Sequence, residues 1–193
     1  MPRISAPTLV EHREKQRSAL LGAARDLAAE TEGRGVTFAA VASRAGLARS
    51  SVYEYFASPA VLLAHVVTDE MMGFADEIER EVEPVSDPAE RVRAFVRTWL
   101  RYVADGRHRV VQAVLTSPMP EECIAAVGEM HERMARPLIG ALHDLGVSDP
   151  ARSADFIRGV VEATARRIQE GHPASRETAD AEEFVLRGVG VAQ

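Results

Sequence analysis

The stretch Thr37–Phe56 reads TFAAVASRAGLARSSVYEYF, and its spacing decides the predicted fold. Thr37 is a residue type that caps helices, and Gly46 is the type that tolerates a left-handed turn. The stretch therefore predicts a short helix over FAAVASRA, a turn at Gly46 and a second short helix over ARSSVYEYF. Ala42 precedes the glycine by four residues and Val52 follows it by six, which suits a helix crossing and an inward-facing apolar residue. This pattern is typical of a helix-turn-helix.

The second of these short helices has a polar outer face, formed by Arg49, Ser50, Ser51, Tyr53 and Glu54. Such side chains can hydrogen bond to base edges or phosphates, so we expect this face to enter a major groove. Taken singly, each member has an ordinary interpretation: a solvated charge, or an amphipathic tyrosine with a wet hydroxyl. The prediction rests on the joint arrangement, in which a long helix precedes the motif and Ser58-Pro59 opens another long helix.

Apolar residues recur at intervals of three and four along the whole chain, which predicts an all-α fold of about nine helices. The first helix is expected from Val10 to about Glu32, and the fourth from Ser58-Pro59 to near Pro84. Pro137 lies inside the seventh helical pattern and predicts a kink or a break near Arg136. Other helix starts are expected near Asp87, Arg109 and Asp149, and Ser175 is expected to cap the ninth helix. We expect an N-terminal domain over residues 1–57 and a second domain over 58–193, connected by the fourth helix.

The charge of the chain is unevenly distributed. The net charge is −6, yet residues 1–57 hold eight basic and six acidic side chains, a net charge of +2. Because phosphate attraction is local, an acidic second domain does not prevent the first from binding DNA. The single cysteine, Cys123, excludes an intramolecular disulfide. No stretch predicts a signal peptide or membrane helix, so the expectation is a soluble, cytoplasmic protein without a membrane partner.

The motif resembles the N-terminal domain of the TetR/AcrR family of bacterial transcription regulators. That family shows the pattern G-V-S-x-x-T-L-Y-x-H-F-x-S-K-E-x-L, and residues 46–62 here read GLARSSVYEYFASPAVL. The resemblance covers about residues 10 to 70. Pro59 replaces the usual lysine, which removes one phosphate contact, and Arg13 or Arg44 is expected to compensate. Glu54 is unfavourable beside DNA, because an acid near the backbone repels phosphate unless it accepts a hydrogen bond from a cytosine amino group.

The resemblance implies a role for each residue of the motif. Thr37 and Phe38 open the supporting helix near the DNA backbone, and Tyr53 and Tyr55 hold phosphates. Phe56 belongs to the core. The full set of expected DNA-binding residues is Thr37, Phe38, Arg44, Arg49, Ser50, Ser51, Tyr53 and Tyr55.

Residues 85–193 contain no recognisable catalytic motif: there is no Walker loop, G-x-S-x-G, H-E-x-x-H or G-x-G-x-x-G. No histidine has a glutamate three places before it, which argues against a helical di-iron enzyme. His108, His131 and His143 with Glu129 can in principle gather around a metal, but scattered histidines are more often surface residues. We therefore predict no enzyme, no metal and no cofactor.

The resemblance also implies a small-molecule cavity in the second domain and dimerisation through the last two helices. The expected ligand-binding residues are Trp99, Tyr102, Val114, Met130, Met134 and Phe156, although packing of an ordinary core explains each equally well. The expected dimer residues are Phe156, Val160, Val161, Ala165, Ile168, Phe184, Val185 and Val189.

These features together predict a regulator, by default a repressor, that binds double-stranded DNA at a palindromic operator as a homodimer. A small hydrophobic ligand is expected to release it from the DNA. Two alternatives remain open: a helical protein whose first helices bind another protein, and a DNA-binding regulator without a small-molecule ligand.

Overall fold

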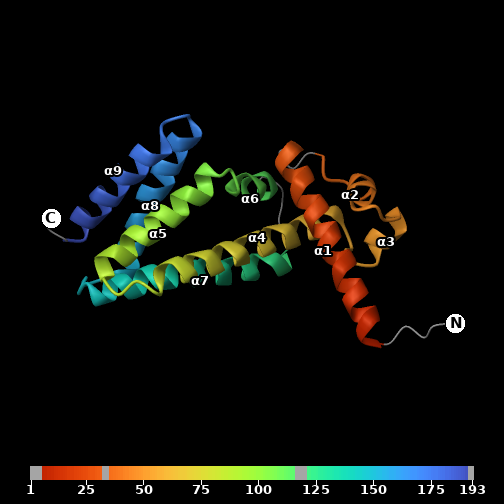
Figure 1. Ribbon diagram of the computed structural model, residues 1–193, viewed down its shortest axis with the longest axis horizontal. Coiled ribbons are helices and arrows are strands. Elements are labelled where there is room, and N and C mark those ends of the chain that lie inside the picture. Colours follow the sequence, from red (N-terminus) through yellow and green to blue (C-terminus); the bar gives the residue numbers. More distant parts are fainter. Residues whose placement is uncertain (1–5, 32–34, 116–120, 191–193) are drawn as a thin grey trace. The chain divides into compact units, whose positions relative to one another are not determined.

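The computed structural model describes residues 6–31, 35–115 and 121–190, together with their side chains outside 6–9, 113–115 and 121–127. Every regular element in these ranges is a helix, which confirms the all-α prediction (Figure 1). The helices are α1 (Ala6–Thr31), α2 (Phe38–Ala45), α3 (Arg49–Tyr53), α4 (Pro59–Val82), α5 (Pro88–Ala104), α6 (His108–Leu115), α7 (Glu121–Asp144), α8 (Pro150–Gln169) and α9 (Ala174–Gly188).

The chain divides into two compact units. The first comprises Met1–Glu70 with Arg109–Ile124, and the second comprises Met71–His108 with Ala125–Gln193. The divisions between them fall inside α4, α6 and α7, and α4 contributes buried residues to both units.

The first unit is organised around one apolar face of α1. In α1, α2 and α3 the spacing of apolar residues at three and four places them on the same side of each helix. The buried side chains of this unit include Leu20, Ala24, Leu27, Val41, Val52, Phe56, Leu62 and Val66. Because α1 packs against α2, and α2 against α3, the polar side of α3 is left facing outward.

The second unit is organised around α5, which packs against both α8 and α9 (Figure 1). Asp87 caps α5 by accepting from the Ala89 amide at 3.1 Å, and Asp149 caps α8 by accepting from the Arg152 amide at 3.1 Å. A proline follows each of these aspartates, where its missing N–H group costs nothing. Both predicted helix starts are therefore confirmed.

Two predicted details of the second unit are wrong. Helix α7 continues through Pro137 to Asp144, so of the kink or break predicted near Arg136 the break is wrong. Burial of Met134, Leu138 and Leu142 on the core side of α7 offsets the one hydrogen bond that proline cannot make. Helix α9 begins before Ser175, because the Pro173 carbonyl accepts from the amides of residues 176 and 177. The N-cap is therefore Pro173 and not Ser175.

Candidate nucleic-acid interface

The turn between α2 and α3 has the backbone geometry that the sequence predicts. The Thr37 hydroxyl accepts from the Ala40 amide at 3.2 Å and caps α2. Gly46 ends α2 with φ 67° and ψ 29°, a left-handed conformation that glycine adopts without steric cost. The next amide, of Leu47, donates to the Ala42 carbonyl at 2.9 Å and so closes the helix end.

A small apolar core holds the two short helices together. Val41, Ala42, Val52 and Phe56 are all almost completely buried. Phe56 also packs against the ring of His65 on α4, with 5.6 Å between ring centroids. The inner side of α3 is thus fixed to the unit, and only its outer side is available to a partner.

The outer side of α3 presents the predicted contact residues. Arg49 and Ser50 are exposed, Ser51 is half-buried, and the Tyr53 side chain is 55% exposed. Arg49 Nη2 donates to the Tyr53 hydroxyl at 3.3 Å. Phe38 is only 4% exposed, and it packs edge-on against the Tyr53 ring at 4.8 Å between centroids. In this unit Phe38 therefore supports Tyr53 from the core side.

Tyr55 is turned toward α1. Its hydroxyl donates to Gln16 Oε1 at 2.7 Å, and the guanidinium of Arg13 lies 5.8 Å from the centroid of its ring. The ring is half-buried. Tyr55 thus ties the end of the motif to α1, and it brings Arg13, one of the two arginines expected to compensate for Pro59, to the same place.

Arg44, the other such arginine, is held by an acid on α1. Its Nη1 and Nη2 atoms donate to the two carboxylate oxygens of Glu30 at 2.6 and 2.8 Å. This pair raises the pKa of Arg44 and lowers the pKa of Glu30, in each case chiefly through the shared hydrogen bonds. Gln16 and Glu30 were not among the predicted site residues, because nothing in their local sequence indicates which distant side chain they meet.

The predicted ligand-binding residues lie in different surroundings. Trp99 and Tyr102 pack on Phe74, at 5.2 and 4.0 Å between ring centroids, and Met134 is buried. Met130 is half-buried, whereas Phe156 is 66% exposed on α8. The side chain of Val114 lies outside those described. Trp99 and Tyr102 are thus brought together, and Phe156 is not part of their cluster.

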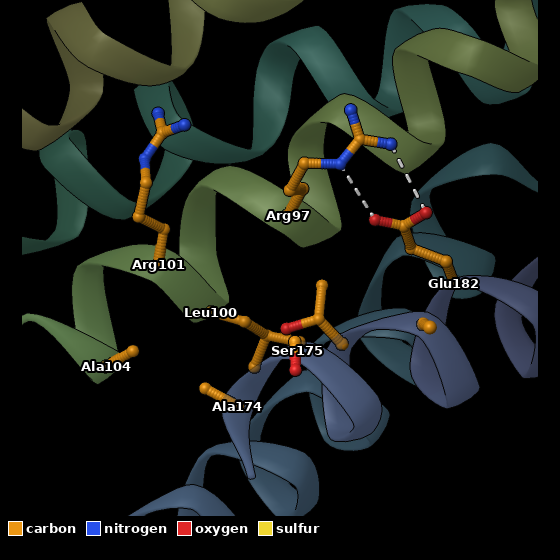
Figure 2. Close-up of a pocket in the computed structure, with 9 residues that line it drawn as sticks. Arg97, Leu100, Arg101, Ala104, Ala174, Ser175 and Glu182 are labelled. Carbon is orange, nitrogen blue, oxygen red and sulfur yellow. Dashed lines mark hydrogen bonds and ion pairs between the residues drawn. The ribbon is translucent and has the colours of Figure 1, made fainter.

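An open groove of about 440 Å³ lies elsewhere in the second unit, between α5 and α9 (Figure 2). Leu100 and Ala104 on α5 face Ala174, Ser175 and the neighbouring α9 residues across it. At its edge, Arg97 donates to both carboxylate oxygens of Glu182, at 3.0 and 3.3 Å. None of the predicted ligand-binding residues lines this groove.

The described parts of the chain contain no cluster of three or more histidine, cysteine, aspartate or glutamate side chains suited to a metal ion. They also contain no helix long and apolar enough to cross a membrane.

Comparison with known proteins identifies the motif. Residues 20–66 match the family model described as "Bacterial regulatory proteins, tetR family". An uncharacterized HTH-type transcriptional regulator from Mycobacterium tuberculosis strain H37Rv is 28% identical over 168 residues, covering 86% of this chain and 82% of the relative.

Solved structures share the fold. The transcriptional regulator FadR from Bacillus subtilis, in complex with stearoyl-CoA, aligns with a TM-score of 0.71 and 17% identity over 91% of this chain and 99% of its own. A transcriptional regulator from Saccharomonospora viridis, in complex with choline, aligns with a TM-score of 0.76 and 16% identity over 89% and 96%. In its helix-turn-helix geometry and in the sequence of residues 20–66, the chain is similar to the TetR family of bacterial regulatory proteins.

Proposed function

We propose that this protein is a homodimeric repressor whose two copies of α3 enter successive major grooves of a palindromic operator and whose second unit senses a small molecule. The observation that carries the proposal is the outward polar face of α3, with Arg49, Ser50 and Tyr53 exposed above a buried inner side. We propose residues 1–57 as the DNA-binding domain and 58–193 as the sensing and dimerising domain.

Exposed aromatic residues on the last two helices support the dimer. Phe156 on α8 and Phe184 on α9 are 66% and 65% exposed, which is unusual for side chains of this size. Helices α8 and α9 pack against each other, and both phenylalanines lie at similar distances along the chain from the turn at Gly171. Val161, Ala165 and Val185 are buried within their own unit, which makes them part of its core. A seam centred on Phe156 and Phe184 would join two helices from each copy.

The ligand is proposed from the fold. Two regulators with the same fold hold stearoyl-CoA and choline in their structures. The ring cluster of Phe74, Trp99 and Tyr102, with Met134 buried in the same unit, is the apolar surface that we propose as part of the sensing site. A dimer on DNA must hold its recognition helices roughly 34–36 Å apart, or a multiple of that. A ligand that favours another spacing lowers operator affinity by its differential affinity for the two states.

DNA binding is tested by selecting genomic fragments bound by the purified protein and measuring affinity for the best duplex over a range of salt. We expect a steep loss of affinity with salt, because several phosphate contacts release counterions. A protein that binds no duplex at low salt would instead favour the alternative of a protein-binding helical module.

Dimerisation is tested by sedimentation velocity on Phe156→Glu and Phe184→Glu. Each substitution places a charge in the proposed seam, so we expect monomers and a loss of operator binding. Ala151→Glu is the matched control, because Ala151 is exposed on α8 but five residues from Phe156, on another face of the helix. Dimers that persist in both phenylalanine variants would place the seam elsewhere.

A further inference from the structure

The first residue of α3, Arg49, has a defined position on an exposed surface. Its Nη2 atom donates to the Tyr53 hydroxyl at 3.3 Å, and its guanidinium carbon lies 6.0 Å from the centroid of the Tyr53 ring. The two residues are four apart on one helix, a spacing that places side chains on the same face. The guanidinium is thus restricted to the neighbourhood of one ring.

Tyr53 is itself held from the core side. Its ring meets the Phe38 ring edge-on at an interplanar angle of 90°, and Phe38 is buried at the start of α2. A continuous series of contacts therefore leads from the core through Phe38 and Tyr53 to the Arg49 guanidinium. Because a long arginine side chain otherwise samples many rotamers, this support reduces the entropy lost when it binds a target.

Arg49 retains most of its hydrogen-bonding capacity. A guanidinium carries five N–H donors, and the bond to Tyr53 uses one of them. Within the described ranges, no acidic side chain forms an ion pair with Arg49, whereas Arg44 is bound by both oxygens of Glu30. The arginine on α3 is therefore available to an external acceptor, and the arginine on α2 is engaged within the protein.

We propose that Arg49 reads a guanine in the operator and that Tyr53 is its positioning residue; this inference rests on the proposed DNA-binding function. The N-terminal residues of a recognition helix are the ones that approach base edges, and Arg49 is the first residue of α3. The planar fork of arginine matches the O6 and N7 acceptors of guanine in the major groove. The Tyr53 hydroxyl accepts from Nη2 at one side of the fork, and this bond leaves the other guanidinium N–H donors available.

The test starts with selection of preferred duplexes from a random DNA pool by the wild-type protein. We expect one guanine in each half-site at which Arg49→Ala and Arg49→Lys lose discrimination by about 5- to 150-fold. Arg49→Lys separates base reading from charge, because lysine keeps the phosphate attraction and the salt dependence but lacks the fork. Arg136→Lys, at an exposed position on α7, is the matched control and should retain the wild-type preference.

Two further measurements separate the roles of the pair. Replacing the guanine by 7-deazaguanine removes the N7 acceptor, so it should weaken the wild type and leave Arg49→Ala unchanged. Tyr53→Phe should reduce discrimination at that same base pair, with no loss at other positions. If Tyr53 instead only held a phosphate, Tyr53→Phe would weaken binding to all sequences about equally. Unchanged helical content and melting temperature confirm that each variant is folded.

The outcomes distinguish this inference from the proposed function. If the wild type selects no duplex, DNA binding itself fails, and the inference fails with it. If the wild type has a sequence preference that Arg49→Ala retains at every position, Arg49 is not a base-reading residue. If Arg49→Ala relaxes the preference but Tyr53→Phe does not, the positioning role of Tyr53 is overturned.

Discussion

Tyr53 in the first unit and Tyr102 in the second have similar neighbours but opposite exposure. Each ring packs against a phenylalanine and lies beneath an arginine: Phe38 and Arg49 for Tyr53, Phe74 and Arg107 for Tyr102. Tyr53 is 55% exposed, whereas Tyr102 is 6% exposed.

The two arginines also differ. Arg107 donates to Glu77 at 2.6 Å, so its charge is compensated within the protein, whereas Arg49 donates to the neutral Tyr53 hydroxyl. The same set of residue types thus forms a core in one unit and a surface suited to an external anion or base in the other.

The largest expected effect comes from removing the two tyrosine rings. Tyr102→Ala should lower the free energy of unfolding by about 3–5 kcal/mol, the usual cost of deleting a buried aromatic side chain. Tyr53→Ala should lower it by about 1 kcal/mol or less, because the ring is half in solvent. Urea titrations followed by circular dichroism measure both. Equal losses would mean that Tyr53 is as much a part of the core as Tyr102.

The next effect concerns the turn that presents α3. Gly46→Ala should cost about 1–2 kcal/mol, because alanine in a left-handed conformation clashes with its own backbone. A Cβ atom at Gly46 meets no other atom within 4 Å, so the cost should be purely conformational. Gly22→Ala is the control: it also meets nothing within 4 Å but lies in the interior of α1, where alanine should stabilise by about 0.5–1 kcal/mol. Shifts of the same sign in thermal melts would refute this explanation.

A smaller effect should appear in the free energy of unfolding at acid pH. Burial raises the pKa of Glu77, but hydrogen bonds and attraction from Arg107 and Arg101 outweigh burial and hold the pKa below its ordinary value of 4.5. The folded state then binds the proton less readily than the unfolded state. Glu77 therefore contributes stability that is fully present above pH 4.5 and is lost as the pH falls through its folded pKa.

Glu77→Gln should accordingly lower stability at neutral pH and flatten its decline below about pH 5. Urea midpoints measured between pH 3 and pH 7 check this. Glu132→Gln, at an exposed position on α7, should leave the profile unchanged. If the urea midpoints of Glu77→Gln ran parallel to those of the wild type across this pH range, the pairing of Glu77 with Arg101 and Arg107 would not control stability at acid pH.

The smallest expected effect concerns Glu30, which is exposed. Glu30→Gln should leave the melting temperature nearly unchanged, because exposed ion pairs contribute little. It should steepen the salt dependence of operator binding by at most about one phosphate contact, since Arg44 would be released toward the DNA. An unchanged slope would indicate that Arg44 serves only to join α2 to α1. Glu162→Gln on α8 controls for the change in net charge.

The sequence predicted the elements of the motif because their causes are local. A capping threonine, a glycine in a left-handed conformation and apolar residues at helical spacing act within a few residues of one another. The same locality explains the correct starts of α5 and α8. The predictions failed at Pro137 and Ser175, where burial along α7 and the cap supplied by Pro173 outweigh the local signal.

The contacts of the predicted site residues were not evident in the sequence, because their partners are distant along the chain. Arg44 meets Glu30, Tyr55 meets Gln16, and Arg107 meets Glu77, and each pair joins different elements. The same holds for the aromatic residues. From the sequence alone, Trp99 and Phe156 are equally suitable as residues of a ligand pocket. Their surroundings differ only after α5, α8 and α9 have packed.

The sequence by itself determined that this protein is helical, that its helix-turn-helix lies at residues 37–56, and that the outer side of the second motif helix is polar, because these follow from backbone preferences and side-chain periodicity. Only the tertiary structure decided which tyrosine is exposed and which arginine is paired with an acid among the described residues. Exposure and charge compensation depend on side chains brought together from distant positions, and no local pattern records those contacts.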